Sequence, residues 1–68
     1  MRKVIKYTQT QGEYTGQIAT CVPAAQEDVA KVLPEVASMT EIEYLNWIIA
    51  RDVNRNNPEN VQIVTVND

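Results

Sequence analysis

A single cysteine, Cys21, and a complete lack of histidine constrain how this chain of 68 residues can be stabilised. One cysteine cannot form an intramolecular disulfide, and without histidine it cannot complete a Cys/His zinc site. A domain of this length gains only about 3–5 kcal/mol of stability from its core and usually needs additional stabilisation of this kind. The sequence therefore predicts one domain, residues 1–68, that depends on good packing or on oligomerisation, with no metal or cofactor.

The net charge of −3 gives no global attraction to nucleic acid or to an anionic membrane surface. No stretch has the length and apolarity of a signal peptide or of a membrane-spanning helix. An unpaired cysteine without a secretion signal or a glycosylation sequon is typical of a reducing compartment. We therefore expect a cytoplasmic protein that does not bind membranes.

The N-terminal third predicts a β-hairpin. Two strand-like segments, KVIKYTQT and EYTGQIATCV, flank Gln11-Gly12, and a two-residue hairpin turn favours glycine. This turn sets Ile5 opposite Ile18 and Tyr7 opposite Gly16. It sorts the side chains into an apolar face with Ile5, Tyr7, Tyr14 and Ile18, and a polar face with Lys6, Thr8, Thr15 and Gln17. A shift of one residue would mix the faces, so the pattern favours this register.

Two helical segments and a strand follow. Val29, Val32, Leu33 and Val36 recur at helical spacing, and Pro34 predicts an end or a kink near Leu33. Thr40 and Glu43 form a capping-box pattern for a helix over residues 41–53. After the turn signal Asn-Pro comes a β-branched run, residues 61–66. This order, ββααβ (or ββαβ with one kinked helix), predicts a small α+β two-layer sandwich with a three-stranded antiparallel sheet under the helices.

The helix over residues 41–53 has apolar residues on two sides. The stripe of Ile42, Leu45, Ile49 and Val53 is predicted to face the sheet, which leaves Tyr44, Trp47, Ile48 and Arg51 on the far side. The preceding helix, a second copy of the chain or another macromolecule are the alternatives that would cover this outer stripe. Trp, Tyr and Arg are the residue types enriched at binding hot spots. We therefore predict a partner-binding site of Tyr44, Trp47, Ile48 and Arg51, with Glu41 and Glu43 as steering charges, and a homodimer through the outer stripe as the default.

Catalytic patterns are lacking in the sequence. There is no histidine base and no glycine-rich phosphate loop, and Glu41 and Glu43 diverge because they are two residues apart on a helix. The segment NRNNPEN lacks the carboxylate spacing of a calcium loop. Cys21 is expected to be a half-buried residue near the polar face of the hairpin. We therefore expect a protein that is not an enzyme.

Two functions remain as expectations. The first is a non-catalytic protein-binding module, a small intracellular regulator, inhibitor or adaptor of the kind that is frequent in phages and other mobile elements. The alternative is a nucleic-acid-binding regulator that uses the basic N-terminal hairpin. Its surface would consist of Arg2, Lys3 and Lys6 with Tyr7 and Tyr14. Three cations make few phosphate contacts on an acidic protein, which disfavours this alternative.

Overall fold

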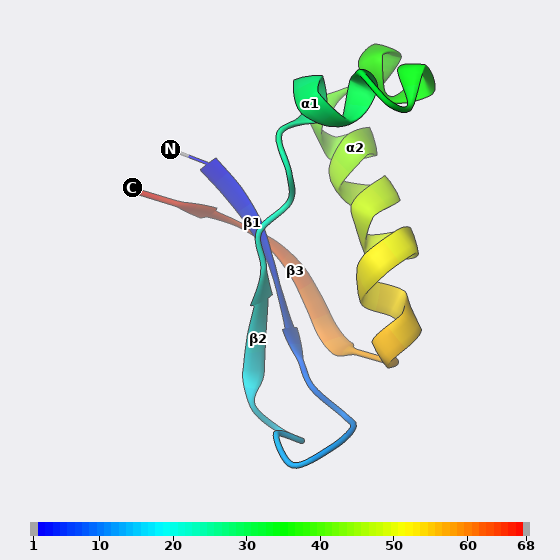
Figure 1. Ribbon diagram of the computed structural model, residues 1–68. Coiled ribbons are helices and arrows are strands. Elements are labelled where there is room, and N and C mark those ends of the chain that lie inside the picture. The colour runs from blue at the N-terminus through cyan, green and yellow to red at the C-terminus, as the bar shows by residue number, and fades with distance from the viewer. Residues whose placement is uncertain (1, 68) are drawn as a thin grey trace.

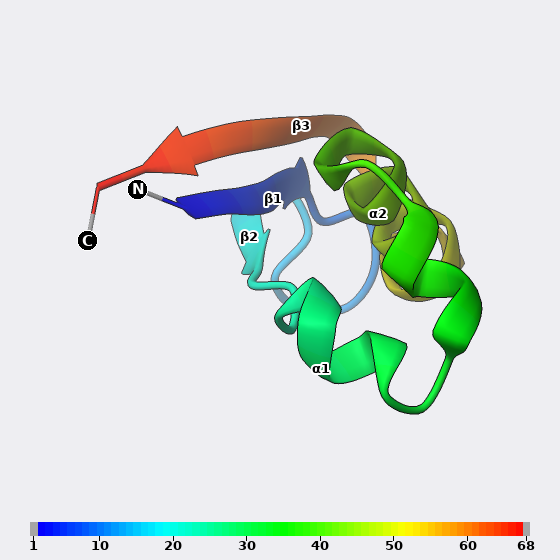
Figure 2. The ribbon, with the colours of Figure 1, turned by 90° about the horizontal axis from the view of Figure 1, so that it is seen from above.

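A three-stranded antiparallel sheet with all helices gathered on one side forms the architecture (Figures 1 and 2). The computed structural model describes residues 2–67. The elements, in chain order, are β1 (Arg2–Thr8), β2 (Ile18–Cys21), α1 (Gln26–Ala30), the 3₁₀ helix η1 (Pro34–Ser38), α2 (Glu41–Ile48), the π-helical segment η2 (Ile49–Val53), the 3₁₀ turn η3 (Asn54–Asn56) and β3 (Glu59–Val66). The predicted α+β fold with the order ββααβ is confirmed.

The N-terminal strand β1 is the centre of the sheet, in the order β2-β1-β3. The C-terminal strand joins it as predicted, with Ile5 opposite Ile63 and Val4 opposite Val64. A register irregularity interrupts this pairing between Lys6 and Thr8, and Asn60 has a positive φ of 53° on the facing part of β3. The regular part of the β1–β3 ladder therefore involves residues 62–66 of β3.

The predicted register of the hairpin is wrong by three residues. Ile5 faces Cys21 and Thr8 faces Ile18, whereas the prediction set Ile5 against Ile18. The connection is longer than two residues: the Gln9 N–H donates to the Gln17 carbonyl (2.9 Å), and the Gly16 N–H donates to the Gln9 carbonyl (2.7 Å). An odd shift moves the side chains of β2 to the opposite face of the sheet. The predicted grouping of Ile18 and Tyr14 with Ile5 and Tyr7 is thereby lost.

A proline and a capping box divide the helical region as predicted. Helix α1 stops at Ala30, and η1 begins at Pro34, whose ring disfavours a helical conformation for the residue before it. At the start of α2 the Thr40 hydroxyl accepts from the Glu43 N–H (3.2 Å), and the Glu43 carboxylate accepts from the Thr40 N–H (2.8 Å). Two of the unsatisfied N–H groups at the helix start are thereby bonded.

The inward face of α2 differs from the prediction. Tyr44 and Ile48 are 4% and 5% exposed, whereas Ile42 of the stripe that was predicted to face the sheet is 49% exposed. Leu45 and Val53, from that same stripe, are buried. In a continuous α-helix Val53 would lie about 140° around the axis from Ile48. The π-helical segment has i→i+5 bonding, which brings these two residues toward the same side, so both reach the core.

The first helical segments cover the outer stripe of α2. Val36 of η1 is fully buried in one cluster with Ile5, Tyr44, Ile48 and Val53. The partly buried residues that pack against this cluster include Val29, Leu33 and Met39, whereas Val32 is exposed. The Gln26 side-chain amide ties the segments together, because it donates to the carbonyls of Val36 (2.9 Å) and Met39 (2.8 Å). The preceding helical segment, through Val36, and the sheet, through Ile5, together account for the burial of Tyr44 and Ile48.

Candidate functional site

Two of the six predicted partner-binding residues belong to the core of the protein. Tyr44 packs inside, and its hydroxyl donates to the Ala24 carbonyl at 2.7 Å. Burial, and secondarily the charge of Asp52, raises the pKa of the Tyr44 phenol. Ile48 lies beside it in the same cluster. Tyr44 and Ile48 are therefore covered within the chain itself, whereas Trp47 of the same stripe is half-buried.

Trp47 and Arg51 lie at the rim of this core. The half-buried Trp47 ring stacks on the Tyr44 ring, with 6.0 Å between centroids and 20° between planes. The Arg51 guanidinium lies 5.1 Å from the centroid of the Trp47 ring, a cation–π geometry. One face of the indole is thus engaged within the chain and the Arg51 side chain reaches solvent. A contact of these two residues with a partner stays a prediction.

The two predicted steering charges have partners within the chain. The Glu41 carboxylate accepts from the Lys3 ammonium at 2.6 Å, an exposed ion pair between α2 and β1. Glu43 is the acidic member of the capping box, and the hydrogen bonds from Thr40, the backbone N–H first, lower the pKa of its carboxyl. The geometry therefore assigns both carboxylates a role in the fold.

The sheet face opposite the helices carries apolar side chains whose exposure ranges from buried (Val4) to exposed (Ile18). Alternation along β1 and β3 directs Val4, Val64 and Val66 away from Ile5 and Ile63, which pack into the helix-covered core. On β2 the three-residue shift places Ile18 on this side, and Ile18 is 63% exposed. Val22, one residue beyond β2, is 56% exposed. We call this surface the open sheet face and define its apolar part as Val4, Ile18, Val22, Val64 and Val66.

The polar side chains of the open sheet face are neutral or cationic. Thr20 and Gln62 are exposed neutral side chains within it, and Lys6 is half-buried between them because it pairs with both residues across the sheet. Val4 is buried, although it lies outside the helix-covered cluster. Alternation along β1 also directs Arg2 to this face, so aliphatic side chains share it with two cationic residues and with neutral polar ones.

The sequence of β3 contains a signal for this surface. A strand with one solvated face alternates apolar and polar residues, but the run VQIVTV has apolar residues at positions of both parities. Val61 and Ile63 face the helices, and Val64 and Val66 face the other side. The predicted hairpin register placed Ile18 on the same face as Ile5, so it did not reveal that Ile18 shares the open sheet face with Val64 and Val66.

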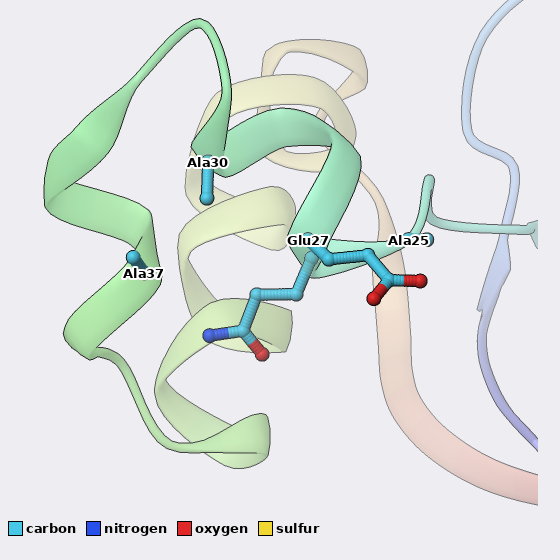
Figure 3. A pocket seen from close by; sticks show the side chains of 5 residues that line it. Ala25, Glu27, Ala30 and Ala37 are labelled. Atoms are coloured by element: carbon cyan, nitrogen blue, oxygen red, sulfur yellow. The ribbon is translucent and has the colours of Figure 1, made fainter.

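A hollow lies between α1 and η1 (Figure 3). It has a volume of about 620 Å³, is wide open to solvent, and is lined by Ala25, Gln26, Glu27, Ala30 and Ala37. Ala30 of α1 and Ala37 of η1 lie on either side of it (Figure 3). The Gln26 amide donates to two backbone carbonyls. Among these lining residues only Glu27 is charged, so the hollow presents a shallow, alanine-rich surface.

Cys21 lies on the helix-covered side of the sheet, opposite Ile5, and not near the polar face as predicted. Its side chain is half-buried, as expected. Burial first and the charge of Asp52 second raise the pKa of the thiol, so the reactive thiolate is disfavoured. Within residues 2–67 no group of three His, Cys, Asp or Glu residues is arranged to hold a metal ion.

The basic hairpin does not form one surface. Lys3 reaches Glu41 on the helix side, and alternation along β1 turns Lys6 to the open sheet face. Tyr7 packs against the core cluster, whereas Tyr14 is exposed in the loop of residues 9–17. The five residues named for a nucleic-acid surface are therefore distributed over both faces of the sheet and its loop.

Searches against models of protein families, curated proteins and solved structures found no match to this chain. In the part of the chain that the structure describes, no helix combines the length and apolarity needed to cross a membrane.

Proposed function

We propose that this protein is a non-catalytic protein-binding module, a small regulator, inhibitor or adaptor, and that its partner docks on the open sheet face. The observation that carries the proposal is the exposure of Ile18, which is 63% exposed and which the pairing of β2 places on the sheet side that the helices leave bare; Val22, directly after β2, is 56% exposed. Ile18 is separated from Val64 and Val66 by the polar row of Lys6, Thr20 and Gln62. Large aliphatic side chains exposed on one face of a small domain support an interaction site there. The predicted site on α2 contributes less to the proposal, because Tyr44 and Ile48 are internal.

The chemistry of the open sheet face favours a protein partner over nucleic acid. Branched aliphatic side chains, with Thr20 and Gln62 between them, provide shape and apolar area but few groups for a phosphate backbone. The alternative of a nucleic-acid-binding regulator has less support because Lys3 pairs with Glu41 and faces the helix side. The lone cysteine supports a cytoplasmic setting for this protein, and a phage or another mobile element as its source rests on general frequency alone.

Affinity capture from the native host tests the proposal with a pair of matched variants. Ile18→Thr and Ile42→Thr make the same change at two exposed isoleucines, one on the open sheet face and one on α2. We expect Ile18→Thr to lose the captured partner and Ile42→Thr to retain it, with circular dichroism showing that both variants fold. Retention by Ile18→Thr together with loss by Ile42→Thr would move the site to the helix side and contradict the proposal.

A further inference from the structure

The outer edge of β3 lacks the features by which proteins protect a sheet edge. As an outer strand, β3 has a hydrogen-bonding neighbour on one side only. Alternate residues of an antiparallel strand direct their N–H and C=O groups away from that neighbour. Natural edge strands are commonly short, charged, interrupted by proline or distorted by a bulge. β3 is 8 residues long, and its only charged residue is Glu59, at its first position.

The unprotected part of the edge is residues 61–66. The register irregularity near Lys6 and the positive φ of Asn60 affect only the beginning of β3. Beyond that point the strand reads VQIVTV, with four β-branched aliphatic residues, no charge and no proline. Such a six-residue segment pairs readily with another strand, and a soluble protein that exposes one is prone to aggregate. An ordered partner on this edge removes that hazard.

The strand is complementary to a second copy of itself. Consider an antiparallel pair of β3 strands with a two-fold axis at Ile63. Ile63 then lies opposite Ile63 of the other copy, Gln62 lies opposite Val64, and Val61 lies opposite Thr65. Val61 meets Thr65 and Ile63 meets its own copy on one face, and such β-branched pairs stabilise a sheet, whereas Gln62 meets Val64 on the other face. Glu59 falls outside the aliphatic stretch, opposite residue 67. No like charges face each other within the pairing.

The charges flanking the paired stretch are complementary as well. Residues 65 and 66 lie beside Lys3 and Arg2 of β1 within the same copy. The pairing brings Glu59 of one copy toward this basic end of the sheet of the other, and the two-fold axis repeats the approach at the opposite end. The attraction is long-range and exposed to solvent, so it aligns the two strands more than it adds affinity. A self-pairing thus satisfies the outward backbone groups of both β3 strands.

We propose that two copies of this chain associate by antiparallel pairing of their β3 strands, which joins the two sheets into one continuous sheet. The contact uses the strand edge and leaves the open sheet faces of both copies available on the same side of the joined sheet. It therefore does not depend on the proposed function, and each copy can still dock a partner protein. An extended segment of a different protein on the same edge is the competing occupant.

Sedimentation equilibrium on the purified chain, together with amide hydrogen exchange followed by NMR, tests this proposal. Gln62→Lys adds a charge at an exposed position of β3, close to the two-fold axis, and Thr20→Lys makes a matched change on the opposite edge strand, β2. We expect a wild-type dimer that Gln62→Lys weakens by about tenfold in dissociation constant, because two like charges then lie diagonally across the two-fold axis on the same face of the joined sheet. Thr20→Lys should remain dimeric, and circular dichroism should show both variants folded.

Exchange reports the pairing mode independently of the variants. In the dimer consecutive amides over residues 61–66 should be protected, whereas a free edge protects only every second one. A wild type that is monomeric at high concentration would overturn the proposal, as would a dimer with alternating protection in β3. Loss of the dimer in Thr20→Lys with retention in Gln62→Lys would assign the contact to β2 or to the open sheet face and would equally overturn it.

Discussion

Replacing Ile48 with alanine tests which side of α2 supports the fold. Ile48 is 5% exposed and belongs to the cluster that joins the sheet, α2 and η1. Removing a large buried aliphatic side chain costs about 2–5 kcal/mol, and a core of this size supplies about 3–5 kcal/mol in total. We therefore expect Ile48→Ala to unfold a large fraction of the molecules at room temperature. Urea denaturation followed by circular dichroism measures the loss.

Ile42 provides the matched control on the same helix. Its side chain is 49% exposed, so it contributes only half of the burial free energy of about 1.5–3 kcal/mol that a fully buried isoleucine would give. Alanine is also the better helix former by a few tenths of a kcal/mol. We expect Ile42→Ala to cost about 1 kcal/mol or less. The difference between the two variants should therefore exceed about 1 kcal/mol.

A milder variant keeps the comparison measurable when Ile48→Ala has no folded baseline. Ile48→Val removes one methylene group and should cost about 0.5–1.5 kcal/mol, whereas Ile42→Val should lie near zero. Equal losses at the two positions, or a larger loss at Ile42, would refute the assignment of the inward face of α2. That result would instead favour the stripe of Ile42 and Ile49 as the one against the sheet.

Three further predictions concern the capping box, the Gln26 bridge and the thiol. Thr40→Ala should lower the free energy of unfolding by about 0.5–2 kcal/mol, measured by urea denaturation. The pKa of the Glu43 carboxyl is lowered below its ordinary 4.5, so the stability that Glu43 contributes is present above that pH and is lost as the pH falls through the folded-state pKa. Glu43→Gln should therefore reduce the dependence of stability on acid pH. Gln26→Glu should cost about 1–3 kcal/mol because a carboxylate cannot donate to the two carbonyls, and the exposed Glu27→Gln is the control. Alkylation of Cys21, followed by mass spectrometry, should be slower in the folded chain than in urea, since its thiol pKa is raised above 9.0.

Three results would contradict these predictions. A Thr40→Ala variant as stable as the wild type would show that water satisfies the helix start equally well. Equal losses of stability in Gln26→Glu and Glu27→Gln would show that the hydrogen bonds of Gln26 between α1 and η1 do not stabilise the fold. An alkylation rate that does not change on unfolding would mean that the thiol is accessible in the folded protein.

Local sequence signals predicted the order and type of the elements well. Pro34 and the Thr40–Glu43 capping box act through the backbone of their own neighbours, so the sequence alone is enough to place them. The β-branched run before the C-terminus is likewise a strand, although it begins at Glu59 and not at Val61. These signals determine the ββααβ order and the three-stranded sheet.

The sequence did not predict which way the elements face, for two physical reasons. Gly12 permits a tight turn, but the structure uses the positive φ of both Gly12 and Gly16 in a longer loop, and the resulting shift reverses the faces of β2. The sequence of α2 offers two apolar sides, and tertiary packing buries Tyr44 and Ile48 within the regular α-helix while the π-helical segment keeps Val53 on that buried side. Both errors concern the rotation of an element about its axis, which depends on tertiary contacts.

The same errors account for the misplaced candidate site. Tyr44, Trp47 and Ile48 have the composition of a hot spot, but a small domain also uses its largest side chains to build a core. Composition alone does not distinguish the two uses. The exposure of Ile18 on the open sheet face follows only from the observed strand register, which the sequence did not predict.

Photo-crosslinking from defined positions tests most directly that the open sheet face is the interaction surface. A photoreactive amino acid replaces Ile18 in one protein and Ile42 in another, two exposed positions on opposite sides of the molecule. After irradiation in extracts of the native host, we expect a covalent adduct with a distinct second protein from position 18 and none from position 42. An adduct from position 42 without one from position 18 would contradict the account and place the partner on α2.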